Sequence, residues 1–64
     1  MNEEFVNEIL NKLRDGELNE YLVKKDQFLE FRNTLVKRED FKHYRGIALH
    51  GGDVLYRYTE DARS

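Results

Sequence analysis

The sequence predicts a small α+β domain with the order α-β-α-β-β, in which two helices pack on one face of a three-stranded antiparallel sheet. Two segments carry apolar residues at helical spacing, a short apolar run lies between them, and a hairpin pattern surrounds Gly51-Gly52. A lone hairpin is marginal in water, so the third strand and the helices would complete its core. We expect one domain: helix about 2–14, short strand about 20–24, helix about 27–38, hairpin about 41–59 and a frayed polar tail over 60–64.

Length and composition limit the class of protein. A chain of 64 residues buries only about 60% of its unfolded surface, so its core is small. It contains no cysteine, which favours a reducing compartment. The sequence has no apolar run long enough to span a membrane, and its acidic N-terminus is unlike a signal peptide. We therefore expect a complete small cytoplasmic protein that does not enter a membrane.

Residues 2–14 give the clearest helical pattern. Phe5, Val6, Ile9, Leu10 and Leu13 follow one helical face. Asn2 is a good N-cap, and Glu3 and Glu4 lie where the helix dipole favours acidic side chains. Gly16 is placed to end the helix in the left-handed conformation.

The segment at residues 20–24 has two interpretations. Tyr21-Leu22-Val23 has good β propensity and predicts a short strand. Alternatively, it continues into the next segment as part of one long helix. We favour the strand because Asp26 is a candidate N-cap for a new helix. That helix, over 27–38, would end near Lys37-Arg38, which match the negative end of its dipole.

The hairpin at residues 41–59 allows a register to be predicted. Gly-Gly suits a two-residue type I′ turn, because both central residues need positive φ. The face expected to meet the helices then carries Leu49/Val54, Ile47/Tyr56, Arg45/Tyr58 and His43/Glu60. The face expected to meet solvent carries His50/Asp53, Ala48/Leu55, Gly46/Arg57, Tyr44/Thr59 and Lys42/Asp61. A longer loop that includes Asp53 is the alternative, and it would shift this pairing.

The sequence lacks a pattern typical of catalysis or of cofactor binding. His43 and His50 lie seven residues apart, so an unbroken strand would place them on opposite faces. His50 and Asp53 would supply only two metal ligands, and we interpret them as a cross-strand pair. Gly51-Gly52 lacks the spacing and the following helix of a phosphate-binding loop. We expect no enzyme activity, catalytic residue, metal or cofactor.

The charge distribution suggests binding rather than chemistry. Residues 1–30 hold four Lys/Arg and eight Asp/Glu, a net charge of −4, whereas residues 31–64 hold seven and five, a net charge of +2. We expect a protein interaction module that could form a homodimer, with an unknown protein partner or self-association. The edge strand at Tyr21-Val23 could pair with another chain. Lys42, Tyr44 and Arg57 form the expected interaction surface, and nucleic-acid binding by the basic later half is the alternative.

Overall fold

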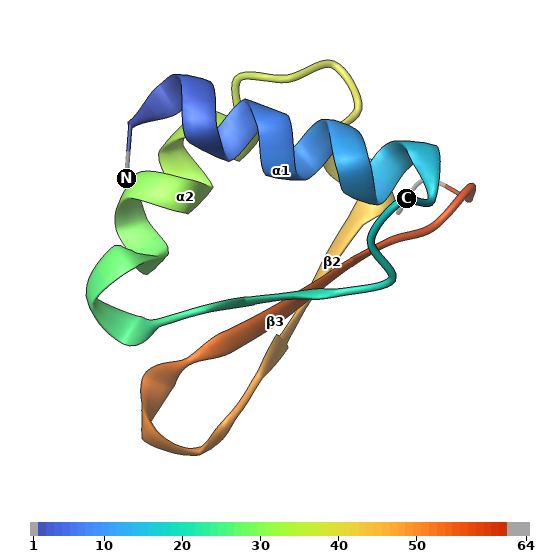
Figure 1. Ribbon diagram of the computed structural model, residues 1–64. Helices are drawn as coiled ribbons and strands as arrows, with labels where there is room; N and C mark the ends of the chain where they lie inside the picture. Colours follow the sequence, from blue (N-terminus) through green and yellow to red (C-terminus); the bar gives the residue numbers. More distant parts are fainter. Residues whose placement is uncertain (1, 62–64) are drawn as a thin grey trace.

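The predicted element order is confirmed by the computed structural model, which describes residues 2–61. The first half contains α1 (Glu3–Asp15), β1 (Tyr21–Val23), the 3-10 turn η1 (Lys25–Gln27) and α2 (Phe28–Leu35). The second half contains η2 (Phe41–His43), β2 (Tyr44–Ala48), η3 (His50–Gly52) and β3 (Val54–Tyr58). The strands form one antiparallel sheet in the order β1-β3-β2, and both helices lie on one side of it (Figure 1). Of the predicted tail, residues 62–64 lie outside the described residues.

Local signals account for α1. The Asn2 side chain accepts a hydrogen bond from the Phe5 N–H at 2.7 Å, which caps a helix start. Gly16 ends the helix with φ of 83°, a conformation that costs glycine little. The buried side chains of the helix are Val6, Ile9, Leu10 and Leu13.

β1 is a strand, so the alternative of one long helix is wrong. Tyr21 pairs with Tyr56 and Val23 pairs with Val54, which makes β1 one edge of the sheet. Val23 is fully buried against the helices. Val23 is thus a buried residue in a strand, the conformation that β-branched side chains favour.

The second helix is shorter than predicted. Asp26 lies inside η1 and does not cap α2; the N-cap position is Gln27, whose side chain makes no capping hydrogen bond. The helix ends at Leu35, because the next residues form tighter turns such as the Arg38 N–H to Leu35 C=O bond at 3.0 Å. These turns redirect the chain so that the Arg38 side chain reaches α1.

The two-residue turn predicted for the hairpin is wrong, and the longer loop is right. Gly51 and Gly52 do have positive φ, 83° and 91°, but the loop covers residues 49–53. It is closed by a 2.8 Å hydrogen bond from the Leu49 N–H to the Asp53 C=O. Ala48 consequently pairs with Val54, one residue away from the predicted register.

This one-residue shift turns β2 over, because side chains alternate between the two faces of a strand. Tyr44, Gly46 and Ala48 lie on the helix side, where Arg45, Ile47 and Leu49 were expected. Tyr44 is 1% exposed, whereas Ile47 is 44% exposed. β3 keeps its predicted orientation, with its Tyr side chains toward the core.

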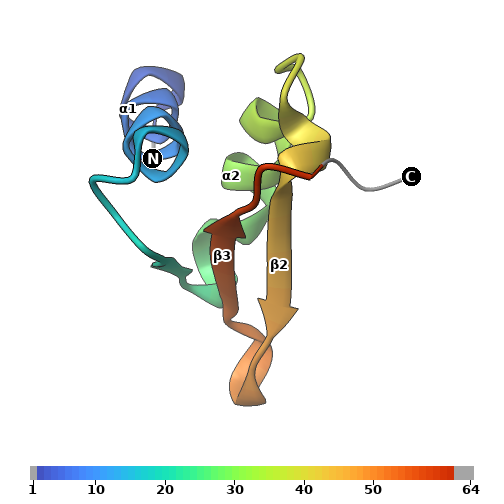
Figure 2. The ribbon, with the colours of Figure 1, turned by 90° about the vertical axis from the view of Figure 1, so that its right-hand side faces the viewer.

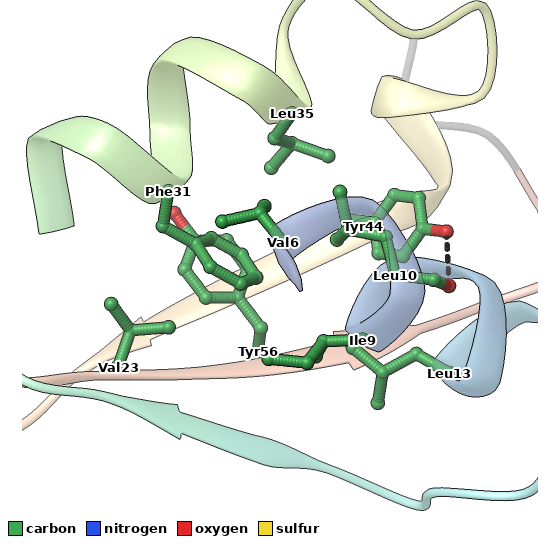
Figure 3. Close-up of a cluster of buried hydrophobic side chains, with 9 residues drawn as sticks. All are labelled: Val6, Ile9, Leu10, Leu13, Val23, Phe31, Leu35, Tyr44 and Tyr56. Carbon is green, nitrogen blue, oxygen red and sulfur yellow. Dashed lines mark hydrogen bonds between the residues drawn. The ribbon is translucent and has the colours of Figure 1, made fainter. Parts of the chain in front are cut away.

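The core lies between the helices and this face of the sheet (Figure 3). Phe31 of α2 is fully buried, and its ring lies 4.8 Å from that of Tyr56 and 6.2 Å from that of Tyr21. Aromatic pairs at such separations add to the free energy gained from burial. Within residues 2–61, nine apolar residues are buried: Val6, Ile9, Leu10, Leu13, Val23, Phe31, Leu35, Tyr44 and Tyr56.

Candidate functional site

The predicted patch of Lys42, Tyr44 and Arg57 is not one exposed surface. Lys42 and Arg57 are exposed, but Tyr44 is buried, and its hydroxyl donates a 2.7 Å hydrogen bond to the Leu10 C=O (Figure 3). Burial raises the pKa of Tyr44 to about 12, so the phenol stays a neutral donor at physiological pH. The expectation that Tyr44 faces solvent is therefore wrong, because the strand register is shifted.

The histidines also differ from the predicted arrangement. His43 lies in η2, where its Nδ1 is 2.9 Å from the Thr59 C=O and its ring stacks on Tyr58. His50 lies in the loop and does not pair with Asp53, which instead accepts the Lys25 N–H at 2.9 Å. Within residues 2–61 no three His, Cys, Asp or Glu side chains converge as a metal site.

A polar cluster around Arg38 was not predicted. The Arg38 guanidinium donates to both carboxylate oxygens of Asp40, at 2.9 and 3.1 Å, and to the side-chain oxygens of Asn7 and Asn11, each at 2.9 Å. This pairing lowers the pKa of Asp40 and raises that of Arg38. The cluster holds the segment after α2 against α1. Its sequence signal was the spacing of the two asparagines, four residues apart on one face of the helix.

The sheet face away from the helices carries a row of aliphatic side chains. In the observed register Leu22 pairs with Leu55, and Leu55 pairs with Ile47, so one residue from each strand enters the row. Leu22 is 40% exposed and Leu55 is half-buried. We call these three residues the aliphatic row.

Charged residues border the aliphatic row on both sides. Extending the register by one residue places Glu20 beside Arg57, and their side chains form an ion pair at 3.6 Å. On the other side Lys24 lies beside Asp53, and the Lys24 Nζ is 3.6 Å from the Asp53 Oδ2. Arg45 pairs with Arg57 across the strands, and it makes no ion pair with any described residue. Glu20, Lys24 and Arg57 are exposed and their ion pairs are weak, so their charges remain available to another molecule, whereas the Asp53 side chain is 25% exposed.

These features define a small α+β protein whose sheet is covered by helices on one face and open on the other. The chain belongs to the YkzS-like protein family, whose family model matches residues 3–57. No curated protein and no solved structure gives a significant match to the chain. Neither helix within residues 2–61 has the length and apolar character needed to cross a membrane.

Proposed function

We propose that the protein is a cytoplasmic, non-enzymatic interaction module that forms a homodimer through the open face of its sheet. The aliphatic row is the observation that carries this proposal. Leu22 and Ile47 expose about two fifths of their surface, 40% and 44%, side by side with Leu55. Covering such a row removes apolar surface from water, at about 25 cal/mol per Å². The cytoplasmic assignment rests on the lack of cysteine.

The charges beside the aliphatic row support a second copy as the occupant. A two-fold axis along the row would place each strand over the same strand of the other copy, in the opposite direction. Glu20 of one copy then lies over Lys24 of the other, and Arg57 lies over Asp53. Each interaction occurs twice, so the surface is complementary to itself in charge as well as apolar at its centre.

The expected dimer is weak. A face of three short strands is small beside the ~800 Å² per partner of a standard interface. The dissociation constant should therefore be in the micromolar range or above. By mass action, such a dimer would form and separate as the protein concentration changes.

Sedimentation equilibrium over a range of protein concentrations tests the dimer. The wild type should shift from monomer toward dimer, and Ile47→Ser should remain monomeric. Leu29→Ser is the matched control, because Leu29 is 68% exposed on α2 and should not affect association. A wild type that stays monomeric at millimolar concentration would overturn the proposed homodimer.

Nucleic-acid binding is the second candidate, and it rests on the adjacent Arg45 and Arg57 side chains. The burial of Tyr44 removes the aromatic side chain on which a base was expected to stack. Mobility-shift assays with single- and double-stranded oligonucleotides at low salt, where phosphate contacts are strongest, distinguish the candidates. A shift that disappears in Arg45→Gln would favour nucleic acid over self-association.

A further inference from the structure

The second edge of the sheet, the outer edge of β2, is open for strand pairing. No described strand lies beyond β2, which is the last strand of the sheet (Figure 2). Just outside the two ends of β2, the Thr59 N–H donates to the His43 C=O and the Leu49 N–H donates to the Asp53 C=O. Because bonded pairs recur at every second residue of an antiparallel ladder, the odd-numbered residues of β2 bond to β3. Gly46 and Ala48 therefore direct their N–H and C=O groups outward. An unpaired row of this kind is a template for an added strand.

An apolar groove of about 370 Å³ lies beside this open edge. α2 contributes Phe28, Arg32 and Leu35 to the groove, and β2 contributes Tyr44, Gly46 and Ala48. Ala48 is small and exposed, so it leaves room on the side of α2, whereas the Tyr56 ring occupies the space next to Gly46. A strand added to β2 would direct alternate side chains toward this groove, because side chains alternate along a strand. The volume is within the range of known ligand sites.

Arg32 gives the groove a positive charge. It is exposed and makes no ion pair with another residue in the 2–61 range. The neighbouring cations of this region are compensated: Lys37 lies 3.6 Å from Glu3, and Arg38 is bonded to Asp40. A carboxylate in the groove would therefore meet Arg32, with which it can form charge-assisted hydrogen bonds.

We propose that this groove binds an extended peptide segment of another protein. The segment adds to β2 through its backbone, places apolar side chains in the groove and directs an acidic side chain to Arg32. This is β-augmentation, in which backbone bonds supply affinity and alternate side chains supply specificity. A second copy paired through β2 would bring a second Arg32 to the same side of the sheet. Like charges disfavour that arrangement, so the occupant is an acidic-apolar peptide rather than the chain itself.

This site is independent of the proposed homodimer. The groove lies on the helix side of the sheet, whereas the aliphatic row lies on the opposite face. Ile47→Ser should therefore leave peptide binding unchanged. Ile47→Ser reports on self-association and Arg32→Gln reports on peptide binding, so a failure of either proposal can be recognised separately.

Selection from a displayed library of random decapeptides against the full chain provides the probe. Enriched peptides should alternate apolar and polar residues and contain an acidic residue. Their binding should slow the hydrogen exchange of the Gly46 and Ala48 amides, which face the open edge, and change the exchange of the Leu22 amide little. No enrichment over a support without protein, or protection at β1 in place of β2, would overturn the proposal.

Two substitutions and one control complete the experiment. Arg32→Gln should weaken the selected acidic peptide about tenfold, which is the effect of losing a hydrogen bond to a charged group. Ala48→Leu should fill the groove and abolish binding. Arg45→Gln removes an equal charge from the opposite sheet face and should leave affinity unchanged. Equal affinities for wild type and Arg32→Gln, or concentration-dependent protection of Gly46 without peptide, would contradict an acidic peptide as the occupant.

Discussion

Arg38 connects the segment after α2 to α1 through polar contacts. It lies beyond the end of α2, it is 15% exposed at the side chain, and its donors reach one carboxylate and two amides. Asp40 balances its charge, which offsets the cost of its partial burial. The Arg38 guanidinium also lies 6.0 Å from the centre of the Tyr44 ring. Arg38 thus contributes polar contacts that hold the segment after α2 against α1, beside the packing of Phe41 on the core.

We predict that Arg38→Ala destabilises the fold. The change leaves Asp40, Asn7 and Asn11 without their common donor in a partly buried site, and the free energy of unfolding should fall by about 2 kcal/mol. Urea unfolding monitored by circular dichroism measures the effect. Arg14→Ala is the control: its guanidinium bonds the neighbouring Asp15 on the surface, so its removal should change stability little. Equal effects of the two substitutions would refute the role given to Arg38.

Tyr44→Phe tests the buried hydroxyl. At neutral pH the variant should lose about 1 kcal/mol, because the Leu10 C=O loses its hydrogen-bond donor. The pKa of Tyr44 is raised from 10.0 to about 12, so the unfolded chain releases this proton first as pH rises. The wild type should therefore lose stability between pH 10.0 and about 12, and the variant should lose less over that window. Urea unfolding at neutral and alkaline pH measures both effects, and parallel pH profiles would contradict the buried-donor role.

The register of the hairpin is set by packing contacts of its side chains. Tyr44 reaches Leu10 of α1, and within the hairpin the Tyr56 ring lies across Gly46, so one contact with α1 and one between the two strands favour the observed register. The register in turn requires a five-residue loop in place of the two-residue turn that Gly51-Gly52 suggests. The free energy of packing the strand on the core thus outweighs the local preference of the turn.

Gly46→Ala tests whether the Val54 and Tyr56 side chains leave room for a methyl group at residue 46. An added Cβ would lie 3.1 Å from the Val54 Cγ1 and 3.2 Å from the Tyr56 Cε1. The Tyr56 ring is 5% exposed and packs on Phe31, so it has little freedom to move. The variant should lose about 1 kcal/mol of stability by overpacking. Arg45→Ala, on the exposed face of the same strand, is the control, and thermal unfolding of both is the measurement. A Gly46→Ala variant as stable as the wild type would contradict the close contact.

The whole molecule has two layers, and this arrangement creates the surfaces on which its proposed interactions depend. Both helices lie on one face of the sheet (Figure 1). The aliphatic row is therefore open on the other face. β3 is central and β1 and β2 are edges, so two strand edges remain available.

Exchange of charges across the proposed dimer tests its axis. Glu20→Lys and Lys24→Glu should each weaken self-association, because each places like charges opposite one another. An equal mixture of the two variants should associate again, since the lysine introduced in one variant would then face the glutamate introduced in the other. Sedimentation of each variant and of the mixture measures this restoration. Absence of restoration in the mixture would refute the proposed two-fold axis.

Elements whose determinants are close together in the chain could be predicted from sequence. α1 begins at the Asn2 cap and ends at Gly16 as expected, because both signals act within one helical turn. The three-stranded sheet, the two helices on one of its faces and the presence of a C-terminal hairpin were also predicted correctly, whereas the turn, the register and the buried face of β2 were not. The proposed sites were not: the expected patch included Tyr44, and the aliphatic row and the groove both follow from the observed register.

Only the tertiary structure decided which face of β2 is buried. The strand carries apolar residues on both faces, Tyr44 and Ala48 on one and Ile47 on the other, so alternation alone could not choose between them. The choice depends on Leu10 and Tyr56, which meet Tyr44 and Gly46 only after the chain has folded. Local sequence thus determined the helices and strands, whereas contacts between distant residues determined the register and every surface that follows from it.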